Sequence, residues 1–142
     1  MPPLIVTAAL LRKDQKILIT KRPENKQQGG FWEFPGGKLQ SGETPQQALR
    51  REIREELDLE AEIGEIFEVV YHRYDWGPVL ILAYEGRPLS GVIRNLEVAD
   101  HRWITPEELP EYDLLPADRP IVAKLLRQGQ VPNHSPCGQV SL

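Results

Sequence analysis

Apolar residues along this chain gather in short runs that are separated by polar, glycine or proline residues. Residues 4–12 form one such run and predict a buried strand, and residues 16–22, after the polar turn at 13–15, predict its hairpin partner. A second pair of runs meets at Trp76 and Gly77, which predicts two further strands joined there. The expected strands are residues 4–12, 16–22, 31–34, 62–75, 78–88 and 101–105.

Two other segments show the signals of helices that pack on a core. The first begins at Pro45, because Thr44 is a good N-cap, Pro45 suits the first helical position and Gln47 completes a capping box. The second, residues 117–128, has apolar residues at helical spacing. A single helical turn is expected at residues 106–109.

These strands and helices predict one mixed domain. A length of 142 residues favours a single core, and no internal repeat is visible. We expect the fold class α/β (α+β), with a helix on each side of a mixed sheet. This domain spans residues 1–127, and the polar residues 128–142 predict a loosely ordered C-terminal tail.

Composition narrows the classes of partner and the location. The net charge is −4 and no basic stripe stands out, so we expect no nucleic-acid polymer as a partner. The only cysteine is Cys137, which excludes a disulfide within one chain and fits a reducing compartment. Because the apolar runs are strand-sized and the N-terminus lacks a signal-peptide pattern, we expect a cytoplasmic protein with no membrane partner.

The first predicted helix carries glutamates on one stripe. Each helical residue advances about 100°, so Glu52, Glu55 and Glu56 fall within about 100° of one another. Like charges at this spacing destabilise a helix, and the C-terminal end is the unfavourable end for carboxylates. Hard divalent cations take oxygen ligands and also bridge phosphate oxygens. The stripe therefore points to a metal site that handles a phosphate ester or anhydride.

The residues alone leave a second interpretation open. Charge runs are common on solvated helices, and Arg50, Arg51 and Arg54 are placed to pair with the glutamates. The upstream Gly36 and Gly37 favour the metal site instead, because a glycine turn lets the backbone approach a ligand closely. One ion would then receive a backbone carbonyl together with side-chain oxygens.

The segment from Gly37 to Leu59 resembles the Nudix box, the signature of the Nudix hydrolase family. Its fixed spacing over 23 residues makes the resemblance specific. The family's glycine is Asp58 here; aspartate tolerates the left-handed conformation at modest cost, so we expect lost stability rather than lost activity. The segments "FWEFPGGK", "GETPQQA" and "LPADRPIVAKL" extend the resemblance to MutT-type members across residues 4–127. The matching box positions are Gly37, Glu43, Arg51, Glu52, Ile53, Glu55, Glu56 and Leu59.

The resemblance implies the Nudix α/β/α sandwich around a mixed β-sheet. It also implies hydrolysis of nucleoside triphosphates to the monophosphate and pyrophosphate, with Mg²⁺ as cofactor and Mn²⁺ able to substitute. The first substrate candidate is 8-oxo-dGTP, in sanitation of the nucleotide pool for mutation avoidance. The alternatives are a pyrophosphohydrolase of (d)CTP or of a broad range of (d)NTPs, and a non-catalytic nucleotide-binding module. We expect a monomer or a weak homodimer.

The resemblance assigns roles to acidic residues in the box and beyond it. Either Glu52 or Glu97 would be the general base, and Arg51 would hold the carboxylates, with Glu43 as its partner. Glu97 also fits an exposed loop carboxylate. The implied metal ligands are the Gly36 carbonyl and the carboxylates of Glu52, Glu55, Glu56 and Glu97, and the implied catalytic residues are Arg51, Glu52, Glu55 and Glu97.

The charge of Asp118 bears on which base is bound. It stands where an asparagine of the MutT type reads the base, although it also fits an N-cap of the last helix. An ionised carboxylate accepts both guanine donors, N1–H and N2–H₂, whereas a protonated one suits the N3 acceptor and N4–H₂ donor of cytosine. Burial would raise the pKa of such an aspartate. The implied substrate-binding residues are Arg22, Phe34, Lys38 and Asp118. Phe34 could instead be an ordinary core residue, and Lys38 an ordinary surface lysine. Trp32, Trp76 and Trp103 could stack on a base, but packing in the core or at the rim fits them better.

Overall fold

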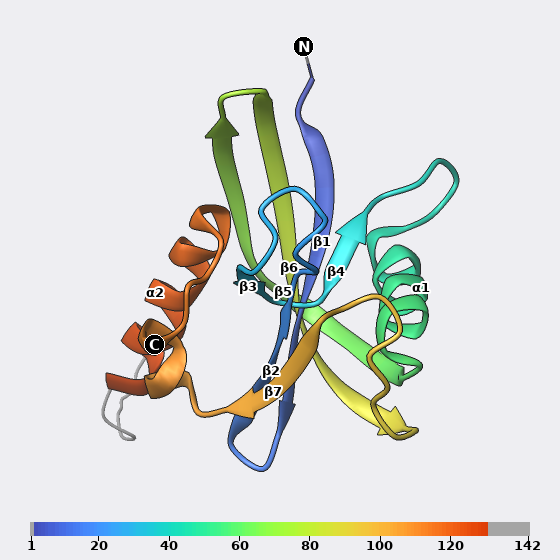
Figure 1. Ribbon diagram of the computed structural model, residues 1–142, viewed down its shortest axis with the longest axis vertical. Helices are drawn as coiled ribbons and strands as arrows, with labels where there is room; N and C mark the ends of the chain where they lie inside the picture. Colours follow the sequence, from blue (N-terminus) through green and yellow to red (C-terminus); the bar gives the residue numbers. More distant parts are fainter. Residues whose placement is uncertain (1, 131–142) are drawn as a thin grey trace, which may run out of the picture.

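The structure, a computed structural model, describes residues 2–130. A seven-stranded mixed sheet crosses the molecule, with one α-helix on either side of it (Figure 1). The predicted strands and helices are all present, with ends that differ by a few residues. In chain order the elements are β1 (Leu4–Lys13), β2 (Lys16–Lys21), β3 (Trp32–Glu33), β4 (Gly36–Lys38), α1 (Pro45–Leu57), β5 (Glu60–Tyr74), β6 (Gly77–Ser90), β7 (Asp100–Ile104), the 3₁₀ helices η1 (Pro106–Glu111) and η2 (Pro116–Asp118), and α2 (Arg119–Gln130).

Strand β1 is the branch point of the sheet. It runs parallel to β6 from Leu4 opposite Val79 onward, and antiparallel to the short β4. The predicted hairpin of β1 and β2 is paired only next to its turn, and β2 then continues along β7 and β3. The other predicted hairpin, β5 with β6, is paired along its length. The main path of the sheet is β3-β2-β1-β6-β5, with β4 on β1 and β7 on β2.

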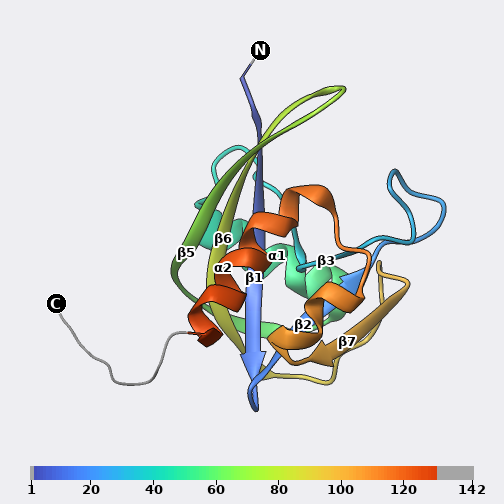
Figure 2. The same ribbon diagram turned by 90° about the vertical axis from the view of Figure 1, so that its left-hand side faces the viewer.

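The two helices cover opposite faces of the sheet. Successive residues of β1 alternate between the two cores, so Leu10 packs on the side of α2 and Leu11 on the side of α1. Figure 2, turned by 90°, shows α2 lying across its face of the sheet. This arrangement confirms the α/β/α sandwich expected from the sequence.

Helix α1 begins and ends as its sequence predicts. The Thr44 hydroxyl accepts the Gln47 backbone N–H at 3.2 Å, and the Gln47 side chain accepts the Thr44 N–H at 2.9 Å. Asp58 ends the helix in the left-handed conformation with φ 55°, the role that glycine usually has. The apolar face is buried through Ala48, Leu49, Ile53 and Leu57, which fixes the polar face relative to the sheet.

Two expectations from the sequence need correction. Gly36 and Gly37 do not form a turn; they belong to β4, because their backbone pairs with Ala8 and Thr7 of β1. Residues 128–130 are the last residues of α2 rather than the start of a tail, and the remainder of that predicted tail lies outside the described residues. Across residues 2–130, no helix has the length and apolar character needed to cross a bilayer.

Candidate active site

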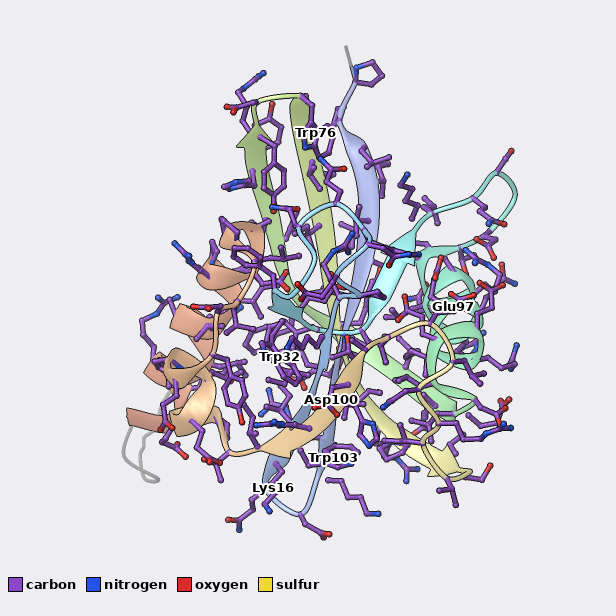
Figure 3. The ribbon with its side chains drawn as sticks, in the orientation of Figure 1. Lys16, Trp32, Trp76, Glu97, Asp100 and Trp103 are labelled. Atoms are coloured by element: carbon purple, nitrogen blue, oxygen red, sulfur yellow. The ribbon has the colours of Figure 1, made fainter. Side chains whose placement is uncertain are left out.

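A cleft of about 650 Å³ lies beside the sheet. Its walls come from strands β1, β4 and β6, the loop between β2 and β3, η2, and the polar face of α1. Figure 3 places Glu97 next to α1 and Trp76 near the turn that joins β5 to β6. The cleft is lined by all four predicted substrate-binding residues, Arg22, Phe34, Lys38 and Asp118, and by Gly36, Glu52, Glu56 and Glu97 of the predicted metal ligands.

The loop that carries Glu97 is bound to the C-terminal end of α1. The backbone N–H groups of Leu96 and Glu97 donate to the Glu56 carbonyl at 3.0 and 3.3 Å, and that of Arg94 donates to the Leu57 carbonyl at 2.9 Å. These bonds satisfy carbonyl groups that a helix end leaves unpaired. They also hold Glu97 beside the glutamates of α1, although it lies about forty residues later in the chain.

The acidic residues of α1 that face the cleft are held at an electrostatic cost. Burial raises the pKa of Glu56 well above its ordinary value, and the nearby carboxylates of Glu33, Glu52 and Glu97 raise it further. Burial also raises the pKa of Glu52, against the lowering effect of Arg51. No arginine, lysine or histidine forms an ion pair with Glu56 within residues 2–130. A cation at this position would therefore relieve the repulsion and give Glu56 the positively charged partner that the described side chains do not supply.

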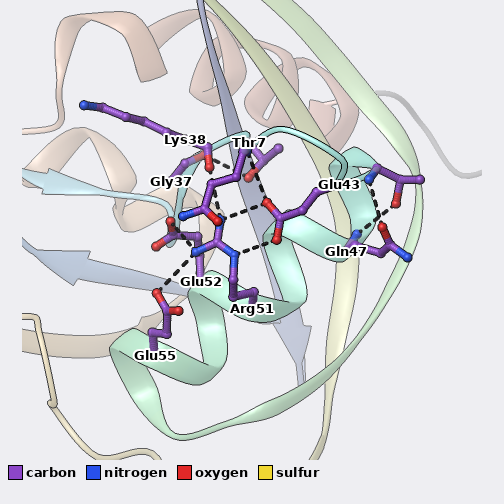
Figure 4. A network of polar contacts seen from close by, with 10 residues as sticks. Thr7, Gly37, Lys38, Glu43, Gln47, Arg51, Glu52 and Glu55 are labelled. Atoms are coloured by element: carbon purple, nitrogen blue, oxygen red, sulfur yellow. Dashed lines mark hydrogen bonds and ion pairs between the residues drawn. The ribbon is translucent and has the colours of Figure 1, made fainter.

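Arg51 is the centre of the polar network in Figure 4. Its Nε donates to Glu43 Oε2 at 2.6 Å and its Nη2 to Glu43 Oε1 at 3.1 Å, a bidentate pair. Nη1 donates to Glu52 Oε2 at 3.1 Å, and Nη2 also donates to the Lys38 carbonyl at 3.2 Å. These carboxylates raise the pKa of Arg51, with Glu43 the largest cause. The predicted pairing of Arg51 with Glu43 is present, and it positions Glu52.

Glu55 lies apart from the other glutamates. Its side chain is half-exposed, pairs with Arg51 Nη1 at 3.3 Å and does not line the cleft. The surface ion pair weighed in the sequence therefore applies to Glu55 but not to Glu56. The metal and catalytic roles of Glu55 stay predictions.

The glycine pair is required for close packing rather than for a turn. A Cβ added at Gly36 would clash with the backbone carbonyl oxygen of Thr7 on the neighbouring strand. A Cβ added at Gly37 would clash with the carboxyl group of Glu52. Gly37 thus leaves the space in which the Glu52 carboxyl lies, and β4 brings the backbone of Gly36 to the same cleft.

The donor chemistry of this cluster fits a hard divalent cation. Carboxylate and carbonyl oxygens are the ligands that Mg²⁺ and Mn²⁺ prefer. Across residues 2–130, no three acidic, histidine or cysteine side chains already converge as closely as ligands of a bound metal do. Like charges repel, so the carboxylates of this cluster stay apart when no cation lies between them. The fit therefore rests on the partly buried Glu56, which forms no ion pair within residues 2–130 and has Glu52 and Glu97 beside it.

The far end of the cleft holds two more acids, the buried Asp118 and the partly buried Glu33. Asp118 is 5% exposed, and its Oδ2 accepts the Phe34 backbone N–H at 3.3 Å. Burial raises the pKa of Asp118 to about 8, and the neighbouring Glu33 contributes to the increase. Burial also raises the pKa of Glu33, although Arg22 Nη1 lies 3.2 Å from its Oε2. The Asp118 carboxyl therefore bonds to β3–β4 backbone rather than acting as a side-chain N-cap.

Several cleft residues, among them one acid and two aromatic residues, were not predicted as site residues from the sequence. Glu33, Tyr74 and Trp76 line the cleft, yet none belongs to the Nudix box. Glu33 lies between the buried Trp32 and Phe34, so strand alternation marks it as facing the other way, but only the fold shows what it faces. Tyr74 is the last residue of β5, and Trp76, in the turn that follows, is the tryptophan for which the sequence favoured core or rim packing.

Comparison with known proteins agrees with this geometry. The NUDIX domain family matches residues 1–125. CTP pyrophosphohydrolase of Escherichia coli (strain K12) is 40% identical over 118 residues, which cover 82% of this chain and 87% of the relative. The 8-oxo-dGTP diphosphatase of the same organism is 30% identical over 133 residues, covering 89% and 99%.

Solved structures show the same fold. The solution structure of the E. coli ORF135 protein has a TM-score of 0.83 at 33% identity and covers 95% of this chain and 96% of that chain. The MutT NUDIX hydrolase from Burkholderia pseudomallei has a TM-score of 0.78 at 28% identity, covering 87% and 98%. With its box on α1, its acidic cleft and these relatives, the chain belongs to the NUDIX family as a MutT-like Nudix hydrolase of the nucleotide-pool type.

Proposed function

We propose that this protein hydrolyses nucleoside triphosphates to the monophosphate and pyrophosphate with Mg²⁺ as cofactor. The observation that carries the proposal is the partly buried Glu56, whose pKa is raised, which forms no ion pair within residues 2–130 and which lies beside Glu52 and Glu97 in the cleft. Mg²⁺ held by these carboxylates and the Gly36 carbonyl would neutralise phosphate charge and polarise the attacked phosphorus. Glu55 would join the outer part of this cluster.

The side chains of the protein supply proton transfer and positioning. Burial makes Glu52 a better proton acceptor than an exposed glutamate, so its carboxylate takes a proton from the attacking water, with Glu97 as the alternative base. Arg51 keeps the Glu52 carboxylate oriented through its 3.1 Å bond. Water attacks the β-phosphorus, and the bond to the α-phosphate oxygen breaks. Lys38 at the rim of the cleft contributes positive charge near the phosphates.

The neutral state of Asp118 favours cytosine as the base. With a pKa of about 8, Asp118 holds its proton at pH 7. Because Oδ2 accepts the Phe34 N–H, the proton belongs on Oδ1, and the group presents a donor beside an acceptor. N3 and N4–H₂ of cytosine complement that pair, whereas N1–H and N2–H₂ of guanine need an ionised carboxylate. O6 and N1–H of guanine also complement a neutral acid, so 8-oxo-dGTP remains the competing substrate.

The relatives support both candidates. The relative that is 40% identical over 118 residues is named a CTP pyrophosphohydrolase. A Mycobacterium tuberculosis relative that is 36% identical over 127 residues is named a putative 8-oxo-dGTP diphosphatase. We place (d)CTP first because the neutral state of Asp118 and the likeness to the CTP pyrophosphohydrolase both favour a cytosine nucleotide.

A substrate panel tests the proposal. The protein is incubated with Mg²⁺ and with CTP, dCTP, 8-oxo-dGTP and the other common (d)NTPs, and kcat/KM is compared by release of pyrophosphate. We expect the monophosphate and pyrophosphate as products and the highest kcat/KM for a cytosine nucleotide. A higher kcat/KM for 8-oxo-dGTP would replace the base assignment, and no hydrolysis of any triphosphate would contradict the proposed function.

Asp118→Asn separates the two charge states of the base-reading group. Asparagine keeps a donor beside an acceptor and so imitates the neutral acid. We expect the variant to keep hydrolysis of the preferred cytosine nucleotide within about tenfold, since at most one hydrogen bond changes strength. A loss far beyond this, with the fold intact, would indicate that Asp118 works as an ionised carboxylate.

A further inference from the structure

We propose that Trp76 is a base-stacking residue that determines nucleotide affinity in this cleft. The inference rests on the proposed function, because it assigns a binding partner to the nucleobase of the triphosphate. The sequence alone favoured packing in the core or at the rim for this tryptophan. The structure favours stacking through three features of its surroundings: exposure within the cleft, support from a second ring, and the anchoring of that second ring.

Trp76 is a large aromatic residue left partly open inside a binding cleft. It lines the cleft, yet 50% of its surface is exposed. Trp32, by contrast, is 8% exposed and packs in the core. A tryptophan of a soluble protein usually buries most of its ring, so an indole that stays open on a ligand cleft indicates a ligand contact.

The indole lies parallel to the ring of Tyr74. Their centroids are 5.4 Å apart and their planes differ by 11°, which is an offset-stacked arrangement. His72 packs edge-on against Tyr74 at 4.5 Å, which supports the same ring from the strand. Because Tyr74 lies along one face of the indole, a flat nucleobase would extend the stack on the opposite face.

Tyr74 is held beside the base-reading acid. Burial raises the pKa of Tyr74, against the lowering effect of the nearby Ala117 backbone and Gln28 side chain. Ala117 directly precedes Asp118, so the aromatic stack lies in the same cleft as the carboxyl that would pair with the base edge, close to it. Tyr74 is thus a positioning residue that fixes Trp76, and Trp76 contacts the base.

The experiment compares Trp76→Ala, Trp76→Phe and a matched control, Tyr71→Ala. Tyr71 lies on β5, the strand that leads to the turn with Trp76, is 58% exposed and does not line the cleft. Binding of α,β-methylene-CTP and α,β-methylene-dGTP in the presence of Mg²⁺ is measured by calorimetry and by quenching of tryptophan fluorescence. Turnover of the triphosphate that the wild type hydrolyses best gives KM and kcat, and thermal unfolding checks that each variant folds.

Stacking makes separate predictions for each variant. Base–aromatic stacking removed by alanine corresponds to about 5- to 150-fold weaker binding, so Trp76→Ala should raise Kd and KM by that factor and leave kcat within about threefold. Trp76→Phe keeps a flat ring and should retain most of the affinity, but ligand-dependent quenching should disappear. Tyr71→Ala should behave as the wild type in every measurement.

Several results would overturn the proposal. Unchanged Kd in folded Trp76→Ala, or quenching that persists in Trp76→Phe, would show that the base does not contact the indole. If the wild type binds neither analogue, the proposal is overturned as well. If the wild type binds an analogue with quenching but hydrolyses no triphosphate, the stacking stands and the proposed function fails. If it hydrolyses triphosphates while Trp76→Ala keeps its KM, the stacking fails alone.

Discussion

Replacing Asp118 with asparagine should change how stability depends on pH. Burial raises the pKa of this carboxyl to about 8 in the folded protein, from an ordinary value of 3.8. At pH values between these two, the folded protein holds a proton that the unfolded chain has released. The free energy of unfolding therefore falls by about 1.4 kcal/mol for each pH unit in this range.

The sign and size of the effect follow from that difference. A carboxyl whose pKa is raised on folding contributes stability that is fully present below the unfolded pKa and is lost as pH rises through the folded pKa. From pH 5 to pH 7 the wild type should lose about 2–3 kcal/mol through Asp118 alone. Asparagine does not titrate, so the variant should lack this loss.

Urea unfolding of both proteins at pH 5, 6 and 7 measures the effect. Burial also raises the pKa of Glu33, Glu52 and Glu56, but these groups are present in both proteins and largely cancel in the difference. We expect the stability of the variant relative to the wild type to increase steadily with pH. A difference that does not change with pH would refute the neutral Asp118 on which the cytosine assignment depends.

The remaining predictions concern the catalytic end of the cleft. Glu52→Gln should lower kcat by at least about 100-fold, because general-base help is lost, while circular dichroism stays unchanged; near-normal turnover would contradict that role. Gly37→Ala should lower kcat by at least about tenfold with little change in Tm, because the added Cβ displaces only the flexible end of Glu52. Gly36→Ala should instead cost about 1–3 kcal/mol in chemical unfolding, because its Cβ meets the backbone of Thr7; equal stability of the two alanine variants would contradict the packing described. Arg51→Lys should lower kcat at constant metal concentration, since lysine cannot replace the bidentate pair, and unchanged kcat would remove its positioning role.

Local signals account for what the sequence predicted well. Thr44, Pro45 and Gln47 predict the start of α1, and Asp58 marks its end. These signals can be read from the sequence because a helix cap depends only on residues within one turn. The resemblance to the Nudix box placed Arg51 with Glu43 correctly, since the box spans a loop and one helix. It also led to Glu97 and Asp118, which no local pattern would single out.

Contacts between distant segments account for what the sequence did not predict. Glycine has low strand propensity, so Gly36 and Gly37 suggested a turn, but pairing with β1 makes them a strand. The partly buried acid Glu33 owes its environment to Arg22 and Asp118, which come from distant parts of the chain. The exposure of Trp76 likewise depends on the cleft that several segments build around it.

A crystal soaked with Mn²⁺ and α,β-methylene-CTP tests the central claim most directly. The anomalous signal of Mn²⁺ locates the metal without reference to activity. We predict a peak about 2.1 Å from carboxylate oxygens of Glu56 and Glu52, between them and the bound phosphates. A nucleotide bound in the cleft without any metal at these glutamates would contradict the account.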